Sequence, residues 1–293
     1  MERQPFIVTP ITNEQRVAAY IAYDEARSTE LHPLEALKTP EEYEAIATAN
    51  FLLGCGLETL GLGKAPVIPD IRIKIFEAPT FGSIENKDFI DGFYEPDKDL
   101  IYIKRSENFD RADFIELMLH ESIHYHSFKS YKYDKGQLVN RRVGYSTPNA
   151  LDEFDEGVVS LMSRWLMESG DTKPAAPEVS YPEIASLILN VSEQTANALG
   201  RRSRDVLEGL YRGLFVPGMG GLRDIRRVYG KSSLYLLGAL GHESEFYQDP
   251  KNIKDFTKLI ALFFSRPGRI TQEELGKSIG ELVRKDEEYA LIA

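Results

Sequence analysis

The sequence predicts an α+β fold in which a small β-sheet packs on helices and the C-terminal portion is mostly helical. Residues 70–76 and 100–104 alternate apolar and polar side chains over the length of a strand. Longer segments on both sides repeat apolar residues at the spacing of a helix. We therefore expect an N-terminal helical portion at 1–68, a central α+β subdomain at 69–168 and a C-terminal helical subdomain at 182–293.

Two capping boxes predict helices in the N-terminal portion. In a capping box, a Ser or Thr side chain and a Glu or Gln three residues later bond to each other's backbone N–H groups. Thr12 with Gln15 and Thr39 with Glu42 have this spacing. We expect the second helix to end near Gly54.

The central subdomain begins with the strand-like segments 70–76 and 100–104, and residues 91–99 read as a further strand that enters a turn. We expect these strands to form a meander. The next segment, residues 111–128, has apolar residues at helical spacing, and Asp110 precedes it as a helix cap. The sequence therefore predicts a mostly buried amphipathic helix there.

This helix contains His120, Glu121 and His124, which form the pattern His-Glu-x-x-His. Residues four apart on a helix share a face, so both imidazoles can reach one tetrahedral metal ion, with Glu121 beside a bound water. His126 lies about 200° around the helix from His124, and we exclude it as a ligand. The alternative is that both histidines are core residues bonded to backbone carbonyl groups.

A catalytic zinc ion needs a third protein ligand, and the next predicted helix, residues 151–165, offers two candidates. Glu156 and Ser160 lie opposite the apolar stripe of this helix, while Glu153 lies one turn from Glu156. A solvated acidic face would explain the run 152–156 without a metal. The residues of the apolar stripe are Phe154, Val158, Leu161, Met162 and Trp165.

The C-terminal portion follows a Pro- and Gly-containing linker at residues 169–177. Thr271 with Glu274 is a third capping box. Apolar residues at helical spacing predict helices near 183–199, 204–215, 222–240, 252–265 and 272–291.

The sequence around Glu156 resembles that of the gluzincins, a clan of zinc peptidases. In these enzymes a His-Glu-x-x-His helix precedes a second helix that donates a glutamate ligand. In that clan the glutamate often follows an apolar residue and Asn and precedes Gly or Ala. The stretch Phe154-Asp155-Glu156-Gly157 is similar to this pattern, as are the apolar residues that follow it. The resemblance implies a zincin-like fold and a Zn²⁺ ion held by His120, His124 and Glu156.

The same resemblance suggests roles for residues outside the ligand set. Many gluzincins place an acidic residue four positions after the ligand glutamate to orient an imidazole, but here Ser160 stands there. Glu116 could serve instead, or it is an exposed surface glutamate. Tyr145 and His242 match the two oxyanion donors of thermolysin-type enzymes in approximate position. The alternatives are a packed or surface role for Tyr145 and a helix-terminal surface position for His242. Glu95 has a weak likeness to the glutamate of gluzincin aminopeptidases.

The amino-acid composition limits the partners and the cellular location that we expect for the protein. The 293 residues include 35 Lys and Arg and 46 Asp and Glu, a net charge of −11. Such a surface repels phosphate backbones, so we expect no nucleic-acid partner, and a solvated helix face explains the local arginines at 201–204 and 226–227. No apolar run approaches the roughly 18 residues of a membrane span. Cys55 is the single cysteine, so the metal site cannot be built from several thiolates. With one cysteine no intrachain disulfide can form, and we expect a cytoplasmic protein.

Two functions from different classes fit these patterns. The first is a zinc metallopeptidase that hydrolyses peptide or protein substrates by attack of a zinc-bound water with Glu121 as the base. The second is a zincin-like binding or regulatory protein whose metal site is structural, vestigial or latent. Glu121 favours the enzyme, because a structural site needs no general base. The sequence predicts neither the substrate nor the oligomeric state.

Overall fold

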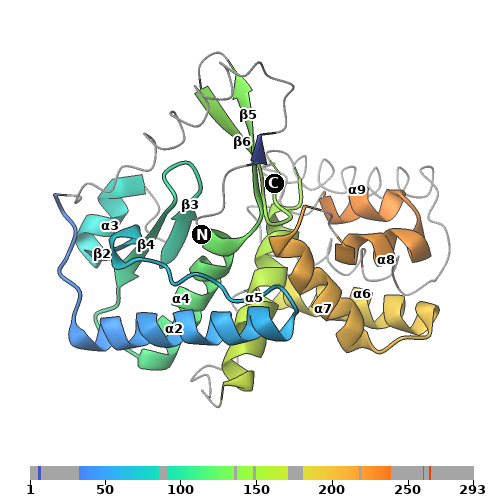
Figure 1. The fold of residues 1–293 in the computed structure, drawn as a ribbon, viewed down its shortest axis with the longest axis horizontal. Helices are drawn as coiled ribbons and strands as arrows, with labels where there is room; N and C mark the ends of the chain where they lie inside the picture. Colours follow the sequence, from blue (N-terminus) through green and yellow to red (C-terminus); the bar gives the residue numbers. More distant parts are fainter. Residues whose placement is uncertain are drawn as a thin grey trace, which may run out of the picture. The chain divides into compact units, whose positions relative to one another are not determined.

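The computed structural model describes residues 6–7, 33–85, 91–134, 137–147, 150–170, 181–217 and 220–238, together with residues 260 and 264. This part of the chain is a mixed α+β structure with two small sheets, as predicted (Figure 1). It divides into two compact units. The first unit comprises residues 1–144 and 161–178, and the second comprises 145–160 and 179–293.

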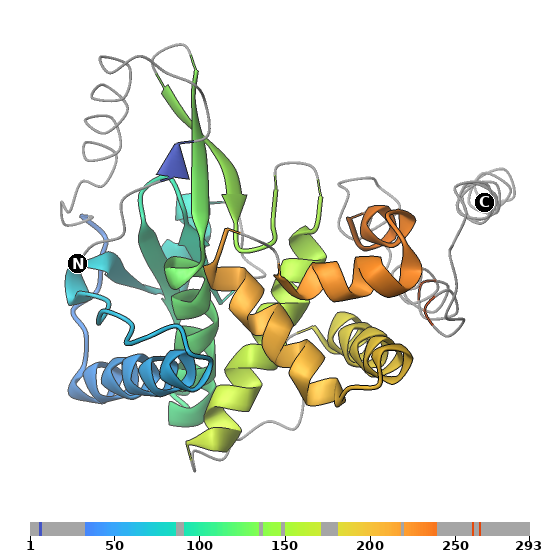
Figure 2. The ribbon, with the colours of Figure 1, turned by 45° about the vertical axis from the view of Figure 1, so that its right-hand side comes forward.

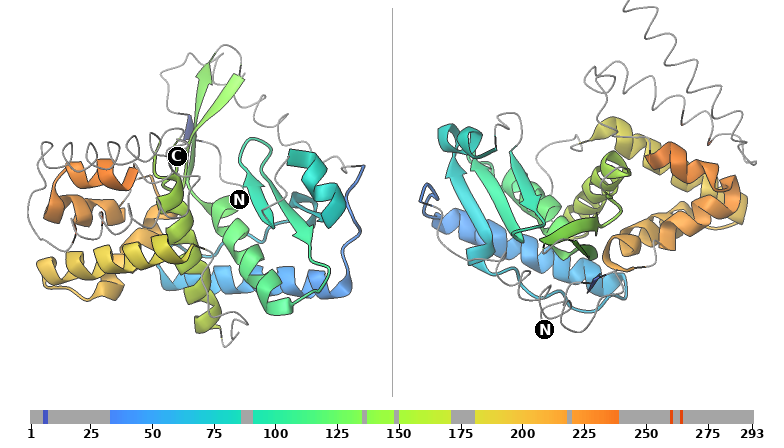
Figure 3. Two further views of the ribbon diagram at one scale, coloured as in Figure 1. Left: turned by 180° about the vertical axis from the view of Figure 1, so that it is seen from behind. Right: turned by 90° about the horizontal axis from the view of Figure 1, so that it is seen from above.

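This division differs from the three predicted portions. Helix α2 (Pro40–Thr59) belongs to the first unit, where it packs against helix α4 (Arg111–His126), as both views of Figure 3 show. Residues 33–68 are therefore part of the unit that holds α4. Helix α5 (Asp152–Ser169) contributes its first nine residues to the second unit and the rest to the first.

The capping box that opens α2 is confirmed. The Thr39 side chain accepts a hydrogen bond from the Glu42 backbone N–H, and the Glu42 carboxylate accepts one from the Thr39 N–H. The predicted end near Gly54 is wrong, because α2 continues to Thr59. A Cβ at position 54 would meet no atom within 4 Å, so Gly54 lies on an open face, where it interrupts no packing. The capping boxes at Thr12 and Thr271 lie outside the described residues.

The first sheet contains β2 (Ile73–Glu77), β3 (Gly92–Glu95) and β4 (Leu100–Arg105) in the order β2-β4-β3. The three predicted strands exist, but the meander is wrong, because β2 and β4 are parallel. The reason is α3 (Ala78–Glu85), a short helix after β2 that the sequence did not predict and that lets the chain cross over before β3. The sheet is therefore mixed, with β4 at its centre and α4 against it.

The second sheet contains an antiparallel hairpin, β5 (Lys129–Asp134) and β6 (Gln137–Val143), and a two-residue strand, β1 (Phe6–Ile7), parallel to β5. Figure 2 shows this hairpin extending from the end of α4. The sequence did not predict it. The hairpin returns the chain toward α5, so it links the two helices that carry the candidate ligands.

The second unit is helical, as predicted for the C-terminal portion. Its helices α6 (Pro182–Leu199), α7 (Ser203–Phe215) and α8 (Gly220–Tyr229) pack on one another (Figure 2). The helix predicted at 222–240 is two helices, α8 and α9 (Ser232–Gly238), because Gly230 adopts a φ of 84° between them. The helices predicted near 252–265 and 272–291 lie outside the described segments, apart from residues 260 and 264. No helix in the described part of the chain is long and apolar enough to cross a membrane.

Candidate metal centre

Helix α4 presents two histidines at its C-terminal half, as the sequence predicts. The Asp110 carboxylate caps the helix by accepting hydrogen bonds from the N–H groups of Ala112 and Asp113, at 2.7 and 3.1 Å. His120 and His124 follow on one face, and each is only 7% exposed. Two imidazoles this deeply buried need polar partners, which distinguishes them from surface histidines.

A partly buried lysine lies at the other end of α4. The Lys129 ammonium lies 2.6 Å from an Asp99 carboxylate oxygen and between the rings of Tyr94 and Tyr125, 4.6 and 4.8 Å from their centroids. The Tyr94 hydroxyl donates to the same Asp99 oxygen at 2.7 Å. Because Tyr125 directly follows His124, this cluster limits the movement of the last turn of α4. This cluster could not be predicted from the sequence, because its members come from four separate segments.

Helix α5 brings a glutamate to the same place. Glu156 is half-buried and is followed by Gly157, where a Cβ would lie 2.5 Å from an Ile184 methyl carbon and 2.7 Å from an Ile188 methyl carbon. Only glycine allows α6 to approach α5 this closely. Packing therefore explains the glycine at position 157, and the close contact that it allows holds the first turns of α5 beside α6.

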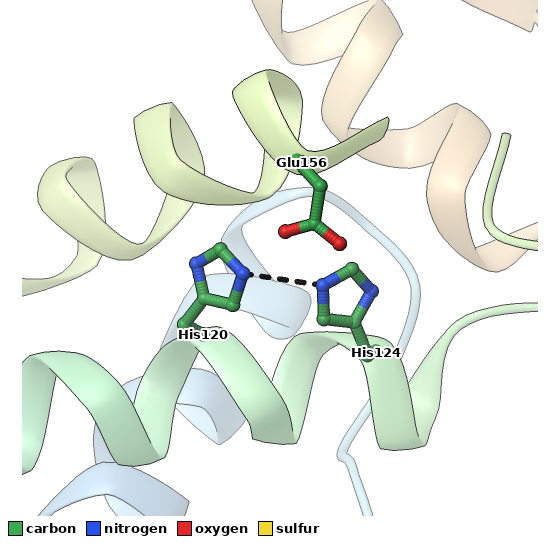
Figure 4. Close-up of side chains that lie close together, drawn as sticks. All are labelled: His120, His124 and Glu156. Carbon is green, nitrogen blue, oxygen red and sulfur yellow. Dashed lines mark hydrogen bonds between the residues drawn. The ribbon is translucent and has the colours of Figure 1, made fainter. Parts of the chain in front are cut away.

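His120, His124 and Glu156 converge on one point. Each offers one ligand atom, and these three atoms lie within 4.8 Å of one another. Nε2 of His120 is 3.2 Å from Nε2 of His124. Figure 4 shows the Glu156 carboxylate pointing from α5 toward the two imidazole rings on α4. This arrangement could hold a metal ion.

The spacing of the two imidazole nitrogens can be compared with that of a zinc site. Zinc bonds imidazole nitrogen at about 2.0–2.1 Å in a tetrahedral arrangement, which places two such nitrogens about 3.3 Å apart. The observed separation of 3.2 Å agrees with that value. Two imidazole nitrogens and one carboxylate oxygen would leave the fourth position of a tetrahedral ion open. Of the two candidate glutamates, Glu156 belongs to this group and Glu153 does not.

Three further glutamates lie within about one helical turn of a candidate ligand on α4 and α5. Glu121 is 4% exposed and directly follows His120 on α4. Burial raises the pKa of the Glu116 carboxyl above its ordinary value of 4.5, while Arg164 acts in the opposite direction. Burial also raises the pKa of the Glu153 carboxyl, and the negative charges of Glu156 and Asp152 raise it further. The acidic run of α5 is therefore a partly desolvated cluster, not a fully solvated face.

Tyr145 occupies a position that argues against its oxyanion role. Its side chain is fully buried, and its hydroxyl donates a hydrogen bond to the Leu210 carbonyl oxygen at 2.8 Å. The ring packs edge-on against Phe154, with ring centroids 5.5 Å apart. This is the packed role that was the alternative for this residue. A hydroxyl bound to a backbone carbonyl is not placed to stabilise charge on a substrate.

The other residues considered from the sequence lie outside the metal-binding group or outside the described residues. His242 lies outside the described residues. His126 is buried against Tyr125 and is not part of the metal-binding group, as predicted. Ser160 is buried within α5, where it is 1% exposed. The Glu95 carboxylate forms an ion pair with Lys98, with 3.0 Å between a carboxylate oxygen and the ammonium nitrogen.

Comparison of the chain with protein-family models, with curated proteins and with solved structures gives no match. The candidate metal centre therefore rests on its own geometry. That geometry consists of three convergent ligand atoms on two helices, in a donor set and at a spacing that fit zinc.

Proposed function

We propose that the protein is a zinc-dependent metallopeptidase of the gluzincin type. The observation that carries this proposal is the convergence of His120, His124 and Glu156. Zinc at such a site supplies a Lewis acid that polarises a carbonyl group and lowers the pKa of a water molecule. The proposal is supported by three side chains that could serve as the ligands for this chemistry, and by the carboxylate of Glu121 next to the first of them in the sequence.

In this proposal each residue has one role. The two imidazoles and the Glu156 carboxylate hold the ion. Glu121 accepts a proton from the attacking water and donates it to the leaving nitrogen, which avoids free hydroxide and the expulsion of an amide anion. A structural zinc site needs no such base beside its ligands, so Glu121 favours catalysis.

The sheet offers a site for an extended substrate. In the described part of the chain, β3 lies at one edge of the β2-β4-β3 sheet and packs against α4. A peptide that adds to a sheet edge is held by main-chain hydrogen bonds, which do not depend on its side chains. A peptide or protein in extended conformation is therefore the substrate class that we propose.

One observation favours a second candidate function. The Tyr145 hydroxyl, which matched the oxyanion donor of thermolysin-type enzymes, is bonded to Leu210. A protein that binds zinc without an oxyanion donor would use the metal for binding or regulation. Such a protein would keep the ligands but show no turnover.

A cleavage assay separates the two functions. The zinc-loaded protein is incubated with a peptide library, alongside Glu121→Gln and a chelator-treated sample. We expect cleavage by the parental protein alone, with turnover of Glu121→Gln lower by roughly 10²- to 10⁴-fold at equal zinc content. Bound zinc without cleavage of any peptide would favour the binding function, and cleavage by Glu121→Gln at the parental rate would exclude Glu121 as the base.

A further inference from the structure

The segment that precedes α5 is bonded to the first turns of that helix. The Tyr145 backbone N–H donates a hydrogen bond to Oδ1 of Asp155 at 2.6 Å, and Asp155 is only 1% exposed. The Ser146 hydroxyl donates to the Asp152 carboxylate. Leu151 adopts a φ of 71°, so the chain turns sharply into the helix. The start of α5 is thus held by side chains that reach back to the preceding segment.

Tyr145 is itself fixed on its other side. Its hydroxyl donates to the Leu210 carbonyl of α7, and a Cβ at Gly213 would overlap that hydroxyl. The glycine therefore leaves the space that the tyrosine fills. Asp155 binds the backbone of a residue whose ring and hydroxyl are both locked, so the contact is rigid at each end.

Asp155 directly precedes the ligand Glu156. Four of the five residues from 152 to 156 are acidic, and these carboxylates repel one another at the start of one helix. A buried hydrogen bond to a carboxylate is worth more than one between neutral groups, because the acceptor is charged. This bond sets the rotation of the first turns of α5, and with it the direction in which Glu156 projects.

We propose that Asp155 is a positioning residue for Glu156, and that its bond to the Tyr145 N–H preorganises the third metal ligand. This inference rests on the proposed metal centre. It assigns a function to a residue that touches neither metal nor substrate. It also gives Tyr145 a role in the site through its backbone and packing, in place of the oxyanion role.

Zinc affinity, measured by competition with a chelator, tests the proposal on the full chain. Asp155→Ala removes the acceptor, and we expect zinc to bind at least about tenfold more weakly, as for other residues that orient a ligand. Asp155→Asn keeps an oxygen at the same position, so it should bind zinc within about threefold of the parental protein. Rescue by Asn and loss by Ala is the pattern that a positioning role requires.

Tyr229→Phe is the matched control for stability. The Tyr229 hydroxyl is buried in the same unit and donates to the Phe264 carbonyl oxygen at 2.9 Å. Its loss should lower the melting temperature of the metal-free protein and leave zinc affinity unchanged. If Asp155→Ala does not fold, Tyr145→Phe takes its place, and it should weaken zinc binding by a few-fold where Tyr229→Phe does not.

The possible outcomes distinguish a failure of the positioning role from a failure of the proposed metal centre. A parental protein that binds no zinc overturns the metal centre, and the positioning role falls with it. A parental protein that binds zinc, with an Asp155→Ala variant of equal affinity, overturns the positioning role alone. Equal weakening by Asp155→Ala and Tyr229→Phe also overturns it, because the effect would then reflect general destabilisation.

Discussion

The two buried imidazoles of α4 face each other with Nε2 atoms 3.2 Å apart. An imidazole nitrogen binds a metal ion only through its lone pair, so it cannot hold a proton at the same time. A metal ion uses both lone pairs at once. Binding therefore requires both rings to be neutral, and zinc affinity should fall as the pH drops below the range in which histidine loses its proton.

Replacement of one histidine tests this assignment against a neighbour on the same helix. His120→Ala removes a zinc bond, so the protein should lose its bound metal and its peptide cleavage together. His126→Ala removes an equally buried imidazole that lies outside the metal-binding group, and metal content should stay at the parental value. Metal analysis of the two purified variants provides the measurement. Equal loss of metal from both would contradict the assignment.

Glu116 should make the metal-free protein less stable as the pH rises. In the unfolded chain this carboxyl ionises near 4.5, whereas burial raises its pKa in the folded protein. The folded state therefore holds the proton to a higher pH, and the free energy of unfolding falls through the window above about 4.5. Glu116→Gln removes this contribution.

Urea denaturation of chelator-treated protein measures the effect. The stability of Glu116→Gln relative to the parental protein should increase from about pH 4 to about pH 7, because only the parental protein pays the cost of a desolvated charge. A difference that is the same at both pH values would show that burial does not perturb this group. The chelator is needed because a nearby zinc ion would favour the charged carboxylate.

At the scale of elements, local signals were sufficient for the two helices of the site. Asp110 and the apolar spacing predicted α4 to within two residues of its observed end, and the stripe that includes Phe154 and Val158 predicted α5. The pairing of β2 with β4 was missed, because it depends on the short helix α3 between them. The hairpin β5–β6 was missed as well. The contact between Asp155 and Tyr145 spans ten residues and joins a side chain to a backbone N–H, which no sequence pattern encodes.

Two glycines of α7 test the packing around Tyr145. Alanine at position 213 would overlap the Tyr145 hydroxyl, which cannot move without losing its bond to Leu210. Alanine at position 209 would come no closer than 3.7 Å, to Gly221 Cα. Alanine is favoured over glycine in a helix by about 0.5–1 kcal/mol.

We therefore expect opposite effects from the same substitution. Gly209→Ala should raise the free energy of unfolding by about 0.5–1 kcal/mol. Gly213→Ala should lower it by about 1–3 kcal/mol, as overpacking does. Denaturant unfolding of both variants provides the comparison. A Gly213→Ala variant as stable as Gly209→Ala would mean that Tyr145 is free to move, and would weaken the case for its part in positioning Glu156.

At the scale of the whole molecule, the net charge of −11 constrains the partners but does not name them. The absence of a nucleic-acid partner and the cytoplasmic location remain predictions. Metal binding at the proposed centre would, in contrast, have a direct consequence for the stability of the entire chain. The ligands come from residues 120, 124 and 156, so an unfolded chain does not hold them together.

The melting temperature of the protein should therefore depend on zinc concentration. A ligand that binds only the folded state stabilises it by RT ln(1 + [L]/Kd), about 2.7 kcal/mol at a hundredfold excess over Kd. Calorimetry on metal-free protein titrated with Zn²⁺ should show a progressive rise in melting temperature for the parental protein. Glu121→Gln retains all three ligands and should show the same rise, while Glu156→Ala should show much less. If zinc leaves the parental melting temperature unchanged, the three side chains do not form a metal centre; if Glu121→Gln alone loses the rise, Glu121 is a ligand and not the base.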